Sequence, residues 1–348
     1  MAFVPYGQAA TVTLGVVAYG MTDRLAACIE SLVSHEAEAD FDVVCVVNPD
    51  QRDVDPDVAS LPRGVHAIVP DANLGWAGGM HLVRHASSSD WLGWIQDDST
   101  LLPGWLDAHM AAAIAHPEVG AFGAVALDAS GRAAGFSGGS ASPGTGVRDW
   151  SLSDPTRHGD KPTGVELRDW ITSKGMLVRL TAWDDVGGPC ARHFPLNCVD
   201  LELSTHLRTH GWKLVVVPDA NLTHLQSQSA PGLFREFVSR WHEEEFDFRW
   251  GDPVRRLAAS NGEAVEHDCH GHPDIASIER ECLREASRMV VPLGKYASAR
   301  LREEERRRAE ELEIQSRLYV NSASWRVTAP LRWVRSLARK APKGSPEK

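Results

Sequence analysis

The sequence contains no uninterrupted apolar run of about 18 residues, the length that a membrane-spanning helix requires. Its opening residues also lack the basic stretch and apolar core of a signal peptide. The six cysteines lie far apart without paired spacing, so no disulfide framework is indicated. These absences favour a globular protein of the reducing cytoplasm, in which Cys28 and Cys45 are small core residues.

Basic residues are outnumbered by acidic ones, 36 to 47, which gives a formal net charge of −11. Residues 322–348 contain seven basic residues and one acidic residue, a local charge of +6 that leaves −17 for the rest. Such an acidic body argues against nucleic acid as a partner. The basic tail suits the anionic surface of a membrane, although a poorly ordered tail is an equally good interpretation.

Apolar strand patterns alternate with helical patterns along the first two thirds of the chain. The expected strands cover residues 11–18, 41–47, 65–69, 91–95, 119–127 and 212–217, and the expected helices 22–32, 77–85, 103–115 and 199–210. This alternation predicts an α/β fold with a mixed, mainly parallel sheet flanked by helices on both faces.

Composition divides the chain into three parts. Residues 1–230 carry the strand and helix pattern, and residues 231–320 form a helical extension whose long run of Arg and Glu starts near residue 275. Residues 321–348 form the basic tail. Within the first part, residues 131–164 are rich in Gly, Ser, Pro and Asp and predict a long loop or irregular hairpin, a kind of segment that is usually functional or disordered.

Two motifs in the first part suggest a site for a bound diphosphate. The run NLGWAGGMHLV, residues 73–83, predicts a glycine-rich turn that opens a helix, where free N–H groups favour an anion. Asp97 and Asp98 follow the next apolar strand and offer oxygen ligands suited to Mg²⁺ or Mn²⁺. Each motif alone also fits an ordinary turn or a helix cap.

A third acidic motif lies further along the chain. FPLNCVDLEL, residues 194–203, places Asp200 and Glu202 at the start of a helix, and the final strand then leads to His224. Taken alone, Asp200 fits a helix N-cap better than a catalytic base. The three motifs together reverse that preference.

In this order, the motifs resemble those of family-2 glycosyltransferases with the GT-A fold, particularly bacterial rhamnosyl- and galactofuranosyltransferase-like members. The resemblance covers roughly residues 10–230. It implies that Asp200 is the catalytic base and that Asp98 and His224 bind a divalent metal, Mg²⁺ or Mn²⁺. The positions implied to bind the nucleotide sugar are Ala18, Tyr19, Asn48, Asn73, Gly75, Trp76, Gly78, Gly79 and Asp97.

The chain departs from the family pattern at three positions. Gln96 replaces the first acid of the metal motif, and Val199 replaces the acid that usually precedes the base. The acid that ends the second strand is here Val47 or Asn48, depending on a one-residue choice of register. These departures are also consistent with a second interpretation, a catalytically impaired homologue.

The resemblance implies a metal-dependent, inverting transfer of a sugar from a UDP- or dTDP-linked donor to a glycan or polyprenyl-linked acceptor. The expected setting is cell-surface polysaccharide assembly at the cytoplasmic face of the plasma membrane. A homo-oligomer through the long charged helix remains open, as does a scaffold protein whose helical extension recruits partners. EHDCHGH, residues 266–272, fits no known zinc spacing and favours a solvated loop.

Overall fold

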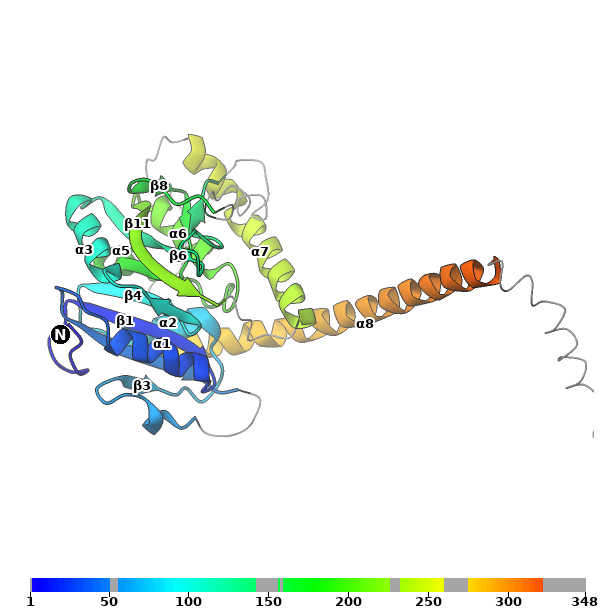
Figure 1. Cartoon of the computed structure of the whole chain (residues 1–348), viewed down its shortest axis with the longest axis horizontal. Helices are drawn as coiled ribbons and strands as arrows, with labels where there is room; N and C mark the ends of the chain where they lie inside the picture. Colours follow the sequence, from blue (N-terminus) through cyan, green and yellow to red (C-terminus); the bar gives the residue numbers. More distant parts are fainter. Residues whose placement is uncertain are drawn as a thin grey trace, which may run out of the picture. The chain divides into compact units, whose positions relative to one another are not determined.

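The computed structural model describes residues 2–50, 56–141, 156, 159–225, 232–259 and 275–321. It divides into two compact units, Met1–Met289 and Val290–Lys348, and each is considered by itself (Figure 1). Among the described residues, no helix is both long enough and apolar enough to cross a membrane.

A mixed sheet forms the centre of the first unit (Figure 1). Its strands are β1 (Val12–Tyr19), β2 (Phe41–Asn48), β3 (His66–Ile68), β4 (Trp91–Gln96), β5 (Ser99–Leu101), β6 (Val119–Leu127), β8 (Glu166–Arg168), β10 (Met176–Arg179) and β11 (Lys213–His224). The order is β3-β2-β1-β4-β10-β6-β11-β5, and β8 also pairs with β11. Strands β1 to β4 are parallel, whereas β10 runs antiparallel to both of its neighbours.

Helices cover both faces of this sheet. They are α1 (Asp23–Val33), α2 (Gly75–Ala86), α3 (Trp105–Ala115), α5 (Leu180–Val186), α6 (Val199–Thr209), α7 (Gly232–Ala259) and α8 (Ile275–Asn321), with a short 3₁₀ turn at Val58–Ser60. One buried core packs α1 and α3 against the sheet, and the other packs α2, α5, α6 and α7. Strand β1 contributes to both cores because successive side chains alternate: Val16 faces the first and Val17 the second.

The fold class expected from the sequence is confirmed: the sheet is mixed and mostly parallel, and helices continue towards the C-terminus. The segment around residues 168–180 forms β8, β10 and the short β9 (Trp170–Ile171), which pairs with β7 (Gly138–Gly139). Strand β11 is twice the expected length, because a register shift against β6 between Val216 and Asn221 lets the strand continue to His224.

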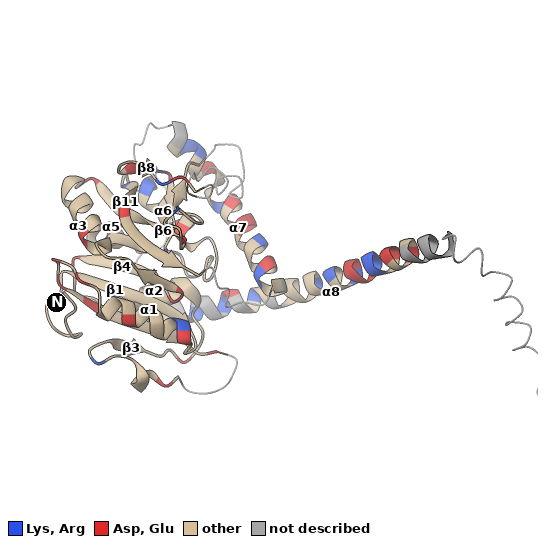
Figure 2. Ribbon diagram, viewed as in Figure 1, with Lys and Arg blue, Asp and Glu red and all other residues tan. Residues whose placement is uncertain are grey.

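Charge follows the same division of the chain. Figure 2 shows Lys, Arg, Asp and Glu gathered on α7 and α8, whereas the sheet strands are mostly uncharged. In α8, ion pairs connect residues one turn apart, such as Arg307 with Glu303 and Arg306 with Glu310. Such pairs stabilise a solvent-exposed helix, and they account for the regular alternation of Arg and Glu in this part of the sequence.

Candidate functional site

The carboxyl ends of three parallel strands meet at one edge of the sheet. Tyr19 ends β1 and pairs with Asn48 at the end of β2, while Val17 pairs with Gln96 at the end of β4. Open α/β sheets bind their ligands at this edge. The structure therefore places the segments that carry Ala18, Tyr19, Asn48 and Asp97 along one border.

Asp98 and His224 are in direct contact at that edge. The imidazole Nε2 of His224 lies 3.0 Å from Asp98 Oδ1 and 2.8 Å from Gln96 Oε1. Both oxygens are acceptors, so the Nε2–H is the donor in this structure. The side chains of His224 and Asp98 are 11% and 5% exposed.

Strand pairing explains how residues so far apart in sequence meet. The short strand β5 begins directly after Asp98 and pairs antiparallel with the end of β11, where Ser99 lies opposite His224. The amide of Leu225 also donates to the carbonyl of Asp98, at 3.1 Å. This pairing fixes the backbone on both sides of the contact between Asp98 and His224.

Asp97, the other carboxylate of the pair, is only partly buried. Burial and the neighbouring charge of Asp98 raise the pKa of Asp97 to about 6, although Arg24 and His224 act in the opposite direction. Two adjacent carboxylates in a partly desolvated place repel one another, and a bound cation relieves that repulsion. The edge therefore has the electrostatic character of a cation site.

The donor atoms present fit a divalent cation that also holds a diphosphate. No three His, Cys, Asp or Glu side chains converge as a metal site within the part of the chain that the structure describes. However, Asp98 and His224 are joined by the Gln96 amide oxygen, and Mg²⁺ in phosphate sites commonly uses one or two carboxylates with substrate oxygens completing its shell. The position where sequence analysis found only a missing acid thus supplies an oxygen beside the imidazole.

Asp200 lies in the first turn of α6 and is only partly buried. Its Oδ2 accepts from the amide of Ser173 at 3.4 Å and its Oδ1 from its neighbour Leu201 at 3.0 Å. Burial raises the pKa of this carboxyl, against the lowering effects of these amides and of Lys174. A carboxylate with a raised pKa and access to solvent is suited to accepting a proton.

Strand β10 brings Asp200 towards the same edge. Met176 at the start of β10 pairs with Trp94 of β4 in an antiparallel arrangement, so the residues before Met176 lie beyond the carboxyl end of β4. Ser173 is one of them and holds Asp200. A Cβ built on Gly175 would lie 2.3 Å from Leu222, two residues before His224. The segment that holds Asp200 therefore packs beside the end of β11.

Glu202 binds the loop before α6. Its side chain is fully buried and its Oε2 accepts from the amide of Cys190 at 3.0 Å, in the loop before α6. Burial raises the pKa of Glu202 to about 8. Its role is to support that loop.

The glycine-rich turn is packed tightly against the protein. The amides of Leu74 and Gly75 are bound by the side chains of Asn48 and Asn73, at 2.9 and 2.8 Å, and the amide of Ala77 donates to Pro195 O at 3.1 Å. These three donors at the start of α2 are engaged within the chain and are not free for a phosphate in this state. The sequence predicts free N–H groups at this turn, whereas in the structure Asn48, Asn73 and Pro195 accept hydrogen bonds from three of them.

The glycines of that turn instead allow close packing. Gly75 adopts a φ of +67°, and a Cβ there would lie 2.4 Å from the carbonyl oxygen of Pro195. At Gly79 a Cβ would lie 2.4 Å from Val17 of β1, so this glycine lets α2 rest on the sheet. Gly78 is buried beside it, and Trp76 is partly exposed, with an indole N–H that has no partner among the described residues.

Other sequence motifs lie elsewhere. Arg179 stacks on Trp91 at 4.4 Å, at the opposite end of β4 from Asp98, and so has no place in this site. Trp150, residues 266–272 and the basic tail at 322–348 lie outside the described residues. Cys28 and Cys45 are buried and unpaired, as expected.

Known proteins place this chain in a family. The family model described as "Glycosyltransferase like family 2" matches residues 9–243, which is more than half of the 348-residue chain. The chain therefore belongs to glycosyltransferase-like family 2. Curated protein sequences give no match.

Among solved structures, the chain is similar to GalNAc-T7, whose crystal structure contains UDP, GalNAc and Mn²⁺, with 12% identity and a TM-score of 0.54. That similarity covers 80% of this chain but 55% of GalNAc-T7, so the chain spans about half the length of that protein. Residues 1–349 of TarS from S. aureus are 10% identical, with a TM-score of 0.43 and coverage of 68% and 72%. At 12% identity the first similarity supports the GT-A fold alone.

Proposed function

We propose that this protein is an inverting glycosyltransferase that moves a hexosyl or deoxyhexosyl unit from a nucleoside-diphosphate sugar to an acceptor hydroxyl. The observation that carries the proposal is the contact of Asp98, His224 and Gln96 at the sheet edge where α/β folds bind nucleotides. Membership of the family and the partly exposed Asp200 beside β10 support it.

The chemistry requires a base and a place for the leaving group. The acceptor oxygen attacks the anomeric carbon, the bond from that carbon to the diphosphate oxygen breaks, and Asp200 takes the acceptor proton. A single displacement of this kind inverts the anomeric configuration. When bound, Mg²⁺ or Mn²⁺ neutralises charge on the departing diphosphate. Asp98 and His224 would hold that ion, with Gln96 beside them.

The finer assignments rest on the family resemblance and on charge. We propose a UDP- or dTDP-linked donor along Ala18, Tyr19, Asp97 and Trp76; the crystal structure of GalNAc-T7, to which this chain is similar in fold, contains UDP and Mn²⁺. The proposed acceptor is a glycan or polyprenyl-linked sugar in surface polysaccharide assembly. The proposed location is the cytoplasmic face of the membrane, to which the basic segment 322–348 would bind.

Donor binding and turnover test the proposal separately. UDP binding in the presence of Mn²⁺ is measured by calorimetry, and release of nucleoside diphosphate is measured with a panel of UDP- and dTDP-sugars. We expect Asp98→Asn to weaken Mn²⁺-dependent UDP binding by at least about tenfold. We expect Asp200→Asn to bind UDP normally but to lose about 10²- to 10⁴-fold in turnover. Asp219→Asn is the matched control, because it makes the same change at an exposed carboxylate on β11, the strand that ends at His224.

The second candidate is a homologue that binds a donor without turning it over. It is favoured by the apolar, buried side chain of Val199 at a position where the family has an acid, and by the lack of an acid at either Val47 or Asn48. Tight UDP binding with no turnover of any donor in the unmodified protein would support this candidate. Full turnover by Asp200→Asn would contradict the assignment of the base.

A further inference from the structure

The loop that leads into Asp200 is held from two sides. It joins α5 to α6 and contains Gly187 to Cys198. On one side α2 fixes it: His81 Nε2 donates to the carbonyl of Pro189 at 2.7 Å, and the amide of Ala77 donates to that of Pro195 at 3.1 Å. On the other side it meets α7, which follows the sheet in sequence.

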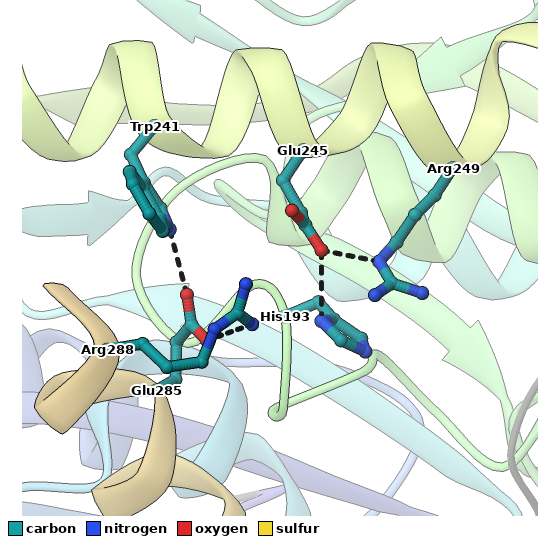
Figure 3. Close-up of polar contacts among 6 residues, drawn as sticks. All are labelled: His193, Trp241, Glu245, Arg249, Glu285 and Arg288. Atoms are coloured by element: carbon teal, nitrogen blue, oxygen red, sulfur yellow. Dashed lines mark hydrogen bonds and ion pairs between the residues drawn. The ribbon is translucent and has the colours of Figure 1, made fainter.

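Helix α7 contacts this loop through three kinds of interaction. The amide of Asn197 donates to Nδ1 of His242 at 3.1 Å. His193 Nδ1 lies 3.2 Å from Glu245 Oε1, which also accepts from Arg249 at 2.7 Å (Figure 3). The ring of Phe194 packs 6.1 Å from the rings of both His242 and Phe246.

The backbone is conformationally unusual between Asn197, which binds His242, and Asp200. Cys198 has a φ of +60°, and it is the one non-glycine residue with positive φ among those the structure describes. A residue with a side chain is strained in this region and stays there only when its surroundings impose the conformation. The bond from Asn197 to His242 is adjacent to Cys198, and Asp200 is two residues further on.

His242 is well suited to this task because it is neutral. Its side chain is fully buried, and burial lowers its pKa to about 4, so Nδ1 remains an acceptor at physiological pH. Its helix is itself anchored: the indole of Trp241 donates to Glu285 at 2.8 Å, and Arg288 pairs with the same buried carboxylate at 2.7 Å (Figure 3). The acceptor is thus held on a fixed support.

We infer that His242 is a positioning residue for Asp200: its Nδ1 holds the Asn197 amide, imposes the left-handed turn at Cys198 and thereby sets the place of the Asp200 carboxylate. This inference rests on the proposed function of Asp200 as the base. It assigns to α7, which follows the last strand of the sheet, an indirect part in the rate of transfer through the position of Asp200.

Two substitutions at position 242 separate hydrogen bonding from packing. The Oδ1 of Asn occupies nearly the place of the imidazole Nδ1, whereas Leu fills the space without an acceptor. In the full-length protein, we expect His242→Leu to lower kcat about 10- to 100-fold, with the KM for donor and the affinity for UDP with Mn²⁺ changed less than about twofold. We expect His242→Asn to keep kcat within about threefold of the original.

Glu245→Gln is the second variant, because Glu245 is partly exposed and its change is less disruptive to folding than one at His242. This change weakens the contact of Glu245 with His193, on the same face of α7 as His242. We therefore expect kcat to fall while the KM for the donor stays unchanged. Glu244→Gln makes the same charge change at the exposed neighbouring position and should leave both constants unaltered.

The outcomes distinguish the inference from the proposed function. If His242→Leu folds and keeps its kcat while Asp200→Asn does not, the positioning role is wrong and the base stands. Equal loss in His242→Asn and His242→Leu also overturns it, since packing alone would then explain the effect. If Asp200→Asn keeps full turnover, the assignment of the base fails, and the inference fails with it.

Discussion

At the residue scale, the contact of Asp98 with His224 depends on strand pairing more than on either residue. The family resemblance implies that both side chains are metal ligands. Their 3.0 Å contact, however, follows from β5, a three-residue strand that no local sequence pattern predicts. Gln96 illustrates the same limit. Its sequence position indicates a lost acid, whereas its side-chain oxygen lies beside the imidazole.

The buried carboxyl of Glu202 gives a prediction about pH. Because burial raises its pKa to about 8, the folded state holds a proton that the unfolded state releases above its ordinary pKa near 4.5. The associated stability is complete below that pH and is lost as pH rises through about 8. Relative to Glu202→Gln, the original protein should therefore lose on the order of 4 kcal/mol of unfolding free energy between pH 5 and about 9, because about three pH units separate pH 5 from the pKa of the folded state.

Urea unfolding of both proteins across this range measures the difference. Glutamine keeps an oxygen for the Cys190 amide, so the comparison isolates the titration. If the unfolding free energies of the two proteins change with pH in the same way, the prediction is wrong.

At the element scale, most strands and helices could be predicted from apolar periodicity, because one or both faces of each are buried in the two cores. The short strands β5, β7 and β9 could not, since two or three residues carry no periodic signal. The packing at the start of α2 could not be predicted from the sequence either. Asn48, Asn73 and Pro195 bind its first amides from three separate segments, so a local reading of the glycines cannot show that those amides are occupied.

Helix α2 gives a second prediction. A methyl group at Gly79 would meet Val17 at 2.4 Å, and both elements are buried, so Gly79→Ala should lower the free energy of unfolding by about 1–3 kcal/mol. Gly251→Ala is the control, because its nearest neighbour would lie 3.7 Å away in α7. That change should be neutral or stabilising by up to about 1 kcal/mol. Equal changes in unfolding free energy for Gly79→Ala and Gly251→Ala, measured by chemical denaturation, would contradict the prediction, because α2 would then shift away from Val17 at little cost.

At the scale of the whole molecule, the first compact unit extends well beyond the sheet and ends at Met289. It includes the first turns of α8, where Glu285 and Met289 are buried and Glu285 binds Trp241 of α7. A boundary near residue 230, which composition suggests, would separate α7 from the loop that it contacts. The composition of the sequence indicates where the charged helices begin, but it cannot predict the buried contacts that join α7 to the sheet.

Two truncations test this division. A protein ending at residue 289 keeps Glu285, so its melting temperature and its affinity for UDP with Mn²⁺ should match those of the full chain. A protein ending at residue 274 removes a buried partner of Trp241 and should melt several degrees lower, since a loss of about 1 kcal/mol moves Tm by about 2–4 °C in a domain of this size. The same melting temperature for both would show that α7 needs no support from α8.

The irregular register of β11 has a consequence for insertions and deletions. Between Val216 and Asn221 the strand takes more residues than its partner β6, and only then resumes the pairing that ends at His224. Because neighbouring side chains point to opposite faces, losing a single residue from this bulge would turn the imidazole to the other face of the sheet. Chain length in 217–220 is thus as much a requirement for the pair with Asp98 as the histidine itself, and natural variants should change in sequence there far more readily than in number.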